Sequence, residues 1–224
     1  ALREALAAEL SLSGRLEAAL GNGRQVGTRR LIGERADAVR ALPGRIVEDS
    51  LLKAVDIASK AKRVCVVGFG PGGFLAGYAA HQFRRAGIPA TAMTATGQGF
   101  ADEQSRLTEG AAVVAMAYDR TREVDVLLDQ AVTFAIPVIQ LTEDALTADP
   151  RATVVLGAGR GEPTHSPTHA TTIIVLESLV LAVAARHAKR ADRATKLLSD
   201  LRGRLTGSQN PGSIADVDTP TTGR

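Results

Sequence analysis

Two loops of this chain carry residue types that could bind a small anion. The first is GFGPGG, residues 68–73, which follows the apolar run RVCVV and precedes a helix-like segment. Turns of this kind usually cradle a phosphate, yet this one has no Ser, Thr or Lys to add a hydroxyl or a cation. The second loop is YDRTRE, residues 118–123, where Arg120 and Arg122 offer guanidinium groups suited to a phosphate or a carboxylate.

The glycines of the first loop are open to more than one interpretation. Gly68, Gly70 and Gly73 have the spacing of the dinucleotide fingerprint, but the segment TAMTATG lacks the acidic residue that holds the ribose. A Walker loop is excluded because no Lys follows the glycines. We therefore expect no cofactor. Either the glycines admit a ligand while an arginine supplies the charge, or they serve only a tight turn between a strand and a helix.

A third polar segment is GEPTHSPTHATT, residues 161–172. His165 and His169 are four residues apart, a spacing that suits a metal pair only when both lie on one helix. Pro163 and Pro167 argue against such a helix, so we expect no metal site.

Catalysis would need a different set of residues. An aldose–ketose isomerase moves a proton between adjacent carbons with a Glu or His of tuned pKa. The candidates are Glu103, His165, His169 and Glu177. Glu177 lies in the apolar run IIVLESLVLAV, where a carboxylate must be paired or have a raised pKa. We assign no catalytic residue.

Composition restricts the class of protein. The chain has 224 residues, 45% of them hydrophobic and 23% charged, which suits one good core with a helical appendage. Its longest apolar run is too short to span a bilayer. The single cysteine, Cys65, excludes a disulfide framework, and with no recognisable leader this favours the cytoplasm.

The charge and the aromatic content bear on nucleic-acid binding. The formal net charge is +3, and basic residues gather in the last helical stretch, from Arg186 to Arg204. This pattern is typical of a solvated helix face, with a nucleic-acid contact as the alternative. Aromatic residues make up only 3% of the chain and Trp is absent, so a base-stacking platform is not expected.

The order of elements predicts an α/β fold. Residues 1–60 show apolar residues at helical spacing, with Asp49 and Ser50 as helix caps and Pro43 and Gly44 at a break. From Arg63, short β-branched runs alternate with helical segments, and continuously apolar strands belong in a parallel sheet that is covered on both faces. We predict a three-layer α/β/α sandwich of five strands, followed by a long apolar helix from about residue 169 to residue 187.

The predicted sheet places the two loops together. Ligands of open parallel sheets bind beyond the carboxyl ends of the strands, where the strand order reverses. With the flavodoxin-like order 2-1-3-4-5, that crevice lies between the first and third strands. Residues 68–73 and 118–123 follow those two strands, so we expect them to flank one site.

The residues from Leu51 onward, LLKAVDIASKAKRVCVVGFGPGGFLAGYAAHQFRRAGIPA, resemble the sugar isomerase (SIS) domain of RpiR-type bacterial transcriptional regulators. The segment LTEGAAVVAMA is similar to the family's third strand, and the likeness covers about residues 50–205. The resemblance implies a homodimer or dimer of dimers, a phosphosugar ligand near residues 164–169, and a DNA-binding helix-turn-helix domain that precedes Ala1.

The sequence departs from the family at the residues that bind phosphate. Gly72 replaces the serine of the first loop, Met116 and Tyr118 replace the two serines of the second loop, and Asp119 replaces its glycine, so that only Thr121 is retained. A hydrogen bond to a charged group contributes roughly 1.5–3 kcal/mol. Losing several of them favours either a role for Arg120 or Arg122, or an anion other than a phosphosugar.

These inferences give one interpretation with two alternatives. We predict a helical linker over residues 1–49, an SIS domain over 50–206 and a disordered tail over 207–224, which together form the cytoplasmic effector-sensing part of a regulator. The alternatives are a sugar-phosphate isomerase and a dimerisation scaffold without ligand. The predicted ligand-binding residues are Gly68, Gly70, Gly72, Gly73, Tyr118, Asp119, Arg120, Thr121, His165, Ser166 and His169.

Overall fold

The computed structural model describes residues 28–143, 148–160 and 168–207. Two helices, α3 (Thr28–Arg40) and α5 (Glu48–Lys60), precede the sheet, with the short α4 (Leu42–Arg45) between them. Strands and helices then alternate, and the chain ends in α9 (Ala170–Arg186) and α10 (Ala188–Thr206). The predicted alternation and the long apolar helix are both confirmed.

The sheet has five parallel strands in the order β2-β1-β3-β4-β5, as the sequence predicted. Their bounds are β1 (Arg63–Val67), β2 (Ala90–Met93), β3 (Ala111–Met116), β4 (Val138–Thr142) and β5 (Val154–Gly157). All six residues of β3 are buried, because a central parallel strand is covered on both faces.

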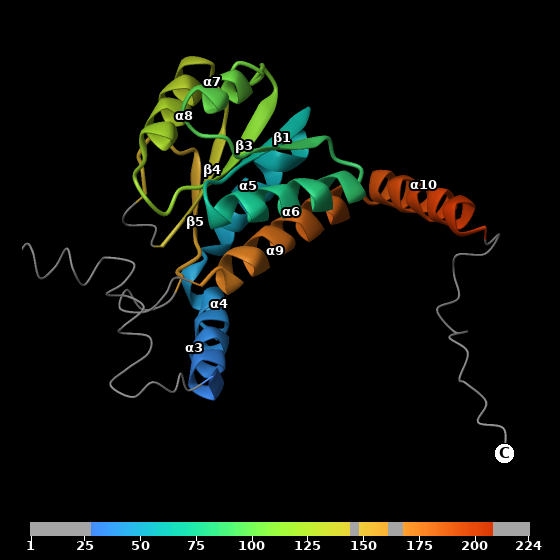
Figure 1. The fold of residues 1–224 in the computed structure, drawn as a ribbon, viewed down its shortest axis with the longest axis horizontal. Coiled ribbons are helices and arrows are strands. Elements are labelled where there is room, and N and C mark those ends of the chain that lie inside the picture. The colour runs from blue at the N-terminus through green and yellow to red at the C-terminus, as the bar shows by residue number, and fades with distance from the viewer. Residues whose placement is uncertain (1–27, 144–147, 161–167, 208–224) are drawn as a thin grey trace, which may run out of the picture.

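Helices cover the sheet on two sides and complete the three-layer sandwich (Figure 1). On one side, α5, α6 (Pro71–Arg85) and α9 contribute buried residues such as Ala54, Phe83 and Leu176 to the larger core cluster. On the other side, α7 (Gly97–Gln104) and α8 (Arg122–Thr133) contribute Phe100 and Leu127 to a second cluster. Burial of these side chains is the main stabilising term of the fold.

One local prediction was wrong and another was confirmed. Asp49 and Ser50 do not cap α5, because the helix begins earlier, at Glu48, and Val47 occupies the cap position. Glu48 and Asp49 lie in the first turn, where their charge favours the positive end of the helix dipole. Pro43 and Gly44 lie between the end of α3 and the start of α5, at the predicted break. They belong to the short α4, where a proline fits the first turn because its missing N–H has no partner there.

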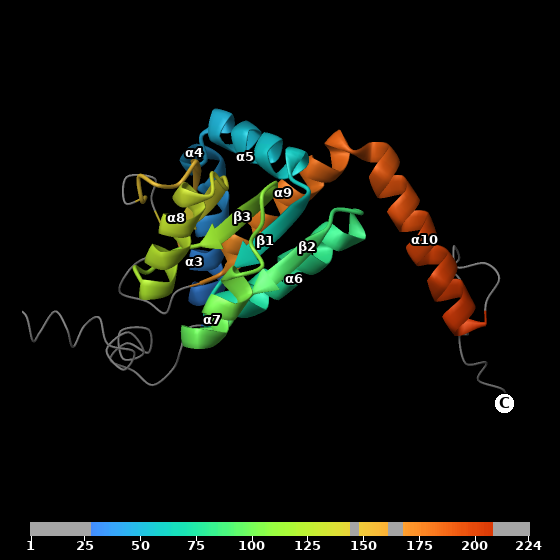
Figure 2. The same ribbon diagram turned by 90° about the horizontal axis from the view of Figure 1, so that it is seen from above.

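The last helix extends away from the rest of the molecule. Figures 1 and 2 both show α10 leaving the end of α9 and running outward from the sheet, and the two helices meet at a bend of 105°. Within the described ranges, no single helix is long and apolar enough to cross a membrane; α9 and α10 reach that length only when counted together.

Candidate ligand-binding site

The first glycine loop is built by close backbone packing. A Cβ added to Gly68 would lie 2.4 Å from the carbonyl oxygen of Gly72 and 2.6 Å from Cε of Met116. Gly70 caps α6 with a φ of +52°, a conformation that favours glycine. Geometry therefore requires glycine at positions 68 and 70.

The backbone N–H groups of this loop are partly occupied. The N–H of Gly72 donates to the carbonyl of Phe69 at 2.9 Å, and that of Gly73 donates to Gly70 at 3.0 Å. These bonds tighten the first turn of α6. They also occupy two backbone donors at the start of α6 that could otherwise bind an anion.

The space between β1 and β3 is lined by a hydrophobic side chain. Met116 is buried at the end of β3, and its methyl group is directed at Gly68. Because Met116 stands where the resembling domains have a serine, the base of the expected crevice is apolar in this protein.

Tyr118 is the centre of a polar cluster at the carboxyl edge of the sheet. Its hydroxyl lies 2.7 Å from Oγ1 of Thr172, in the first turn of α9, and burial raises its pKa to about 12. The ring of His169 lies edge-on to the Tyr118 ring, with the centroids 6.2 Å apart. The hydroxyl of Tyr118 is therefore protonated at neutral pH and can donate a hydrogen bond.

Arg160 covers the other face of Tyr118. Its guanidinium carbon lies 4.2 Å from the centroid of the tyrosine ring, within the range of a cation–π contact. Its Nε donates to Oε1 of Glu143 at 2.6 Å, and its backbone N–H donates to Oε2 at 2.7 Å. Two contacts of the side chain therefore hold a guanidinium group in one orientation at the edge of the site.

The charges around Arg160 limit the affinity for an anion. Glu143 is paired with Arg160, and Oδ1 of Asp119 lies 4.0 Å from its Nη2. Burial, followed by the positive charge of Arg160, lowers the pKa of His169, so that its ring is neutral at pH 7. An incoming anion must therefore compete with two carboxylates and gains no charge from His169.

Arg120 and Thr121 have other contacts. The side chain of Arg120 is 84% exposed and its Nη2 lies 3.8 Å from Oδ2 of Asp149, whose pKa is lowered to about 2, mainly by hydrogen bonds from Arg151. Oγ1 of Thr121 accepts a hydrogen bond from the N–H of Val124 and caps α8. Thr121, predicted as a ligand residue, has a structural role as a cap.

A cavity of about 340 Å³ lies beside the second loop, between the ends of β3 and β4. Tyr118, Asp119 and Arg120 line it from one side, and Gln140 and Thr142 contribute buried polar side chains of β4. The glycines of the first loop do not line it. This cavity therefore lies between β3 and β4, one strand further along the sheet than the predicted crevice between β1 and β3.

The structure thus brings some predicted site residues together and leaves others apart. Tyr118 and His169 are in contact, and Asp119 lies near Arg160, whereas Arg120 is directed toward Asp149. His165 and Ser166 lie outside the described residues. Among the residues that are described, no three His, Cys, Asp or Glu side chains are placed to hold a metal ion.

Sequence reasoning missed Glu143, Arg160 and Thr172. Glu143 directly follows β4, and Arg160 lies three positions after the end of β5. The rule that ligands lie at the carboxyl ends of parallel strands would have found both, had it been applied to every strand. Thr172 lies within HATT, residues 169–172, in which only His169 was predicted to bind ligand.

Glu177, a candidate base, lies away from this cluster. Its Oε1 accepts a short hydrogen bond from the hydroxyl of Tyr78 on α6, and Gln82 donates to the same hydroxyl at 3.1 Å. The expectation that this carboxylate must be paired is met, but its partner Tyr78 lies on α6, away from the cluster around Tyr118.

Comparison with known proteins identifies the fold. No protein-family model matches the sequence, and no curated protein matches it. The sugar isomerase domain of an RpiR transcription factor from Sphaerobacter thermophilus has a TM-score of 0.71 and 22% identity, over 78% of this chain and 98% of that one. The NanR protein of Vibrio vulnificus, solved with ManNAc-6P, has a TM-score of 0.67 and 21% identity, over 80% and 70%.

An enzyme also shares the architecture. The phosphoheptose isomerase GmhA from Neisseria gonorrhoeae has a TM-score of 0.51 and 16% identity, over 75% of this chain and 98% of that one. These likenesses show that the chain has the fold of a sugar isomerase domain, and they confirm the predicted resemblance at the level of the fold. Regulators and isomerases both have this fold, so the fold alone does not distinguish the two functions.

Proposed function

We propose that this chain is the effector-sensing domain of an RpiR-type transcriptional regulator and binds a small anionic metabolite, either a phosphosugar or a carboxylate. The fold is shared with an RpiR factor and with NanR, which was solved with a phosphosugar. The observation that carries the proposal is the orientation of Arg160, whose guanidinium group is stacked on Tyr118 beside Thr172 and His169.

In this proposal, Arg160 supplies the charge that the sequence interpretation sought from Arg120 or Arg122. A guanidinium group fixed by stacking loses little entropy when it binds a second anion. The ligand takes the place of Glu143 on Arg160, while the hydroxyls of Tyr118 and Thr172 replace the serines of the related domains. Gly68 and Gly70 position the loop, and the carboxylate of Asp119 accepts a hydrogen bond from a hydroxyl of the ligand.

Binding to DNA and assembly complete the proposed function. DNA would be contacted by a helix-turn-helix domain that precedes Ala1, and the chain would act in the cytoplasm as a homodimer or a dimer of dimers. The coding sequence upstream of Ala1 tests this directly: roughly seventy to eighty helical residues support a regulator, and an initiator methionine close to Ala1 contradicts it.

The binding test compares charge variants at one site. Thermal-shift and calorimetric titrations are run with phosphosugars, sugar acids and simple carboxylates. Arg160→Gln is expected to weaken binding about tenfold to a hundredfold, because a hydrogen bond to a charged group contributes roughly 1.5–3 kcal/mol. Glu143→Gln is expected to strengthen it, because the competing carboxylate is removed. Arg63→Gln, at the opposite edge of the sheet, is the charge-matched control.

Three results would contradict the proposal. One is equal affinity of the protein and the Arg160→Gln variant for the ligand found in the screen. Another is the absence of any shift with all three ligand classes, which would leave a dimerisation scaffold. A shift with a dinucleotide alone would also mean that the assignment of the site is wrong.

The isomerase alternative has its own test. The fold is shared with GmhA, and the hydroxyl of Tyr118 lies near the neutral ring of His169. The test is to incubate the protein with ketose phosphates and to look for the aldose product. Turnover by the protein that is lost in a His169→Gln variant would show that the protein is an enzyme.

A further inference from the structure

Two side chains of β4 direct polar groups without a partner into the cavity beside the second loop. Gln140 is 4% exposed and Thr142 is 3% exposed, and both line the cavity. Oε1 of Gln140 accepts a hydrogen bond from the N–H of Asp149 at 3.1 Å, but its amide nitrogen has no partner among the described residues. Within the same residues, the hydroxyl of Thr142 has none either. Because buried polar groups are normally hydrogen-bonded, two such groups suit a polar guest.

The alternation of side chains along β4 places both groups on one side of the sheet. Val138, two residues before Gln140, belongs to the core cluster beneath α7 and α8. Successive residues of a strand point to opposite faces, so Gln140 and Thr142 point to the same side as Val138. Val124 and Asp125 of α8 also line the cavity. The cavity therefore lies on the α8 side of the sheet, with two polar groups of β4 in its wall.

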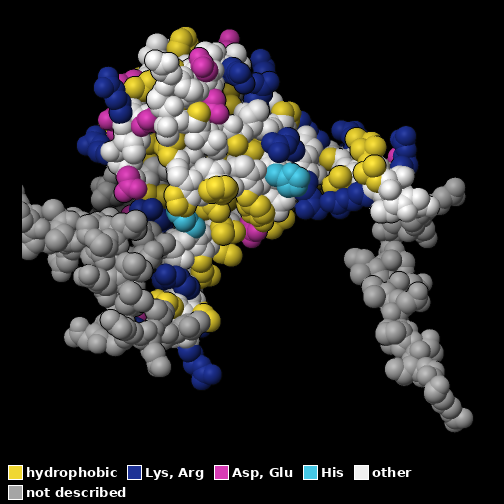
Figure 3. All heavy atoms as spheres, in the orientation of Figure 1, with side chains coloured by type: hydrophobic (Ala, Val, Ile, Leu, Met, Phe, Trp, Pro, Cys, Tyr) yellow, Lys and Arg dark blue, Asp and Glu magenta, His cyan; other side chains and the backbone are white. Residues whose placement is uncertain are grey.

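The size and charge of the cavity suit a short hydroxylated chain. Its volume is about 340 Å³, and a water molecule takes up about 30 Å³ of the liquid, so it holds on the order of ten non-hydrogen atoms. Arg120 is the one cation among the described residues that line it, and its Nη2 lies 3.8 Å from Oδ2 of Asp149. α7 and α8 carry five acidic residues and one basic residue, and Figure 3 shows acidic side chains over these helices. The cavity therefore suits neutral hydroxyl groups better than a second anion.

The second loop joins this cavity to Arg160. Tyr118 and Asp119 both line the cavity. The guanidinium group of Arg160 is stacked on the ring of Tyr118, and its Nη2 lies 4.0 Å from Oδ1 of Asp119. A ligand whose anionic group binds Arg160 can therefore extend past this loop into the cavity.

The groups around Arg160 favour a carboxylate over a phosphate. Arg160 is paired with Glu143, and the neutral ring of His169 adds no positive charge. A phosphate monoester carries a charge of about −1.5 to −2 at pH 7, whereas a carboxylate carries a single charge that one guanidinium group can balance. The backbone N–H groups of Gly72 and Gly73, which could hold further phosphate oxygens, donate within their own loop.

We infer that the ligand is a hydroxylated carboxylate of the sugar-acid class, with its carboxylate on Arg160 and its hydroxyl-bearing chain in the cavity beside Gln140 and Thr142. This ligand class refines the proposed function and rests on it. The amide nitrogen of Gln140 donates to one ligand hydroxyl, and the hydroxyl of Thr142 donates to or accepts from another. Specificity for the chain then comes from β4, and specificity for the charge comes from the loop after β5.

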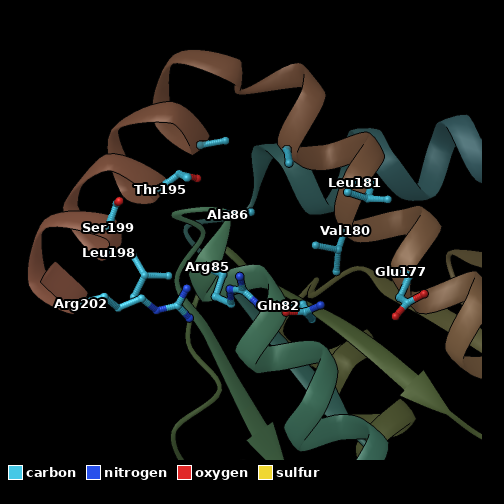
Figure 4. Close-up of a pocket in the computed structure, with 12 residues that line it drawn as sticks. Gln82, Arg85, Ala86, Glu177, Val180, Leu181, Thr195, Leu198, Ser199 and Arg202 are labelled. Atoms are coloured by element: carbon cyan, nitrogen blue, oxygen red, sulfur yellow. The ribbon is translucent and has the colours of Figure 1, made fainter. Parts of the chain in front are cut away.

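A second hollow could also take a carboxylate. A groove of about 580 Å³ lies between α6, α9 and α10. Figure 4 shows Arg85 of α6 and Arg202 of α10 beside it, with Val180 and Leu181 of α9 on its wall. An acid without hydroxyls suits these apolar side chains better than a sugar acid does. An Arg202→Gln variant therefore distinguishes binding in this groove from binding at Arg160.

The first experiment compares matched probes by calorimetric titration of the 224-residue chain. Gluconate, galactonate and mannonate carry a carboxylate and hydroxyls, glucitol 6-phosphate carries a phosphate and hydroxyls, and hexanoate carries a carboxylate alone. We expect at least one of the three sugar acids to bind about tenfold more tightly than both glucitol 6-phosphate and hexanoate. Arg160→Gln should weaken this binding, and Arg202→Gln should leave it unchanged.

The second experiment tests the cavity with a Thr142→Val variant, which removes the hydroxyl and keeps the size of the side chain. Affinity for the sugar acid should fall about twofold to tenfold, the range of one hydrogen bond, and affinity for hexanoate should not change. Urea unfolding without ligand should show no loss of stability, and a loss would contradict the absence of a protein partner for this hydroxyl. Thr91→Val, on the edge strand β2, is the matched control and should leave every affinity unchanged.

Three results would overturn the inference and leave the proposed function in place. Glucitol 6-phosphate that binds more tightly than every sugar acid, with the same loss in Arg160→Gln, would make the ligand a phosphosugar. Hexanoate that binds as tightly as the sugar acids would mean that the cavity takes no hydroxyl groups. A Thr142→Val protein with full affinity for the sugar acid would mean that this hydroxyl does not contact the ligand. Binding of none of the probes, or binding that Arg160→Gln leaves unchanged, would instead contradict the proposed function, and the ligand class with it.

Discussion

A Gly68→Ala substitution tests whether the first loop is a turn with a strict geometry. The new Cβ would lie 2.4 Å from the carbonyl oxygen of Gly72 and 2.6 Å from Cε of Met116. The Met116 side chain can rotate away, but the carbonyl belongs to the first turn of α6 and can move only if the loop moves. Overpacking of this kind costs about 1–3 kcal/mol.

The control is Gly72→Ala in the same loop. No heavy atom lies within 4 Å of the position that its Cβ would take, and its φ is not positive. Alanine at a helical position is favoured over glycine, so this variant should be neutral or more stable by up to about 1 kcal/mol. The two variants therefore change the free energy of unfolding in opposite directions or differ by at least about 1 kcal/mol.

Urea unfolding followed by circular dichroism gives the free energies, and thermal unfolding gives a second measure. For a domain of this size, 1 kcal/mol corresponds to a change in Tm of about 2–4 °C. A Gly68→Ala protein within about 0.5 kcal/mol of the parent would refute the argument, since the loop would then have room that the geometry denies. Destabilisation by Gly72→Ala equal to that by Gly68→Ala would refute it as well.

Two further predictions concern the second loop and α9. Thr121→Ala should lower stability by about 1 kcal/mol, because Thr121 caps α8, and should leave ligand affinity unchanged in calorimetry. The pKa of His169 is lowered from its ordinary value of 6.5, so the stability contributed by its neutral ring is present above pH 6.5 and is lost as the pH falls below it. Urea titrations between pH 7.5 and 5 should therefore show a shallower loss of stability for His169→Gln than for the parent.

The sequence predicted the architecture because hydrophobic patterns respond to burial. The run AAVVAM predicted a strand covered on both faces, and it forms β3, in which every residue is buried. The alternation of strands and helices predicted parallel strands, whereas the order of the strands was taken as the common flavodoxin-like one, which the structure has. The predicted start of α5 was wrong. Asp49 suits both the cap position and the first turn of a helix, and only the backbone conformation shows which of the two positions it occupies.

The candidate site was harder to predict because its residues meet only in the folded chain. Tyr118 and Thr172 are 54 positions apart and are joined by one hydrogen bond. Arg160 is one of many arginines in the sequence, and its orientation depends on the ring of Tyr118 and on Glu143. The sequence pattern predicts which loops lie at the carboxyl edge of the sheet. It does not show that the side chain of Arg160, in the loop after β5, is the cation directed toward Tyr118.

α9 connects the candidate site with the outer side of the helical layer. It follows His169, and Thr172 in its first turn bonds to Tyr118, whereas Glu177 further along the helix bonds to Tyr78 of α6. A shift of α9 therefore changes both contacts. A ligand regulates the proposed homodimer only if it binds the two arrangements of the dimer unequally. Where the ligand shifts the equilibrium between monomer and dimer, linkage requires that dimerisation change the ligand affinity by the same factor, and a ligand affinity that is equal at low and high protein concentration would contradict regulation through dimerisation.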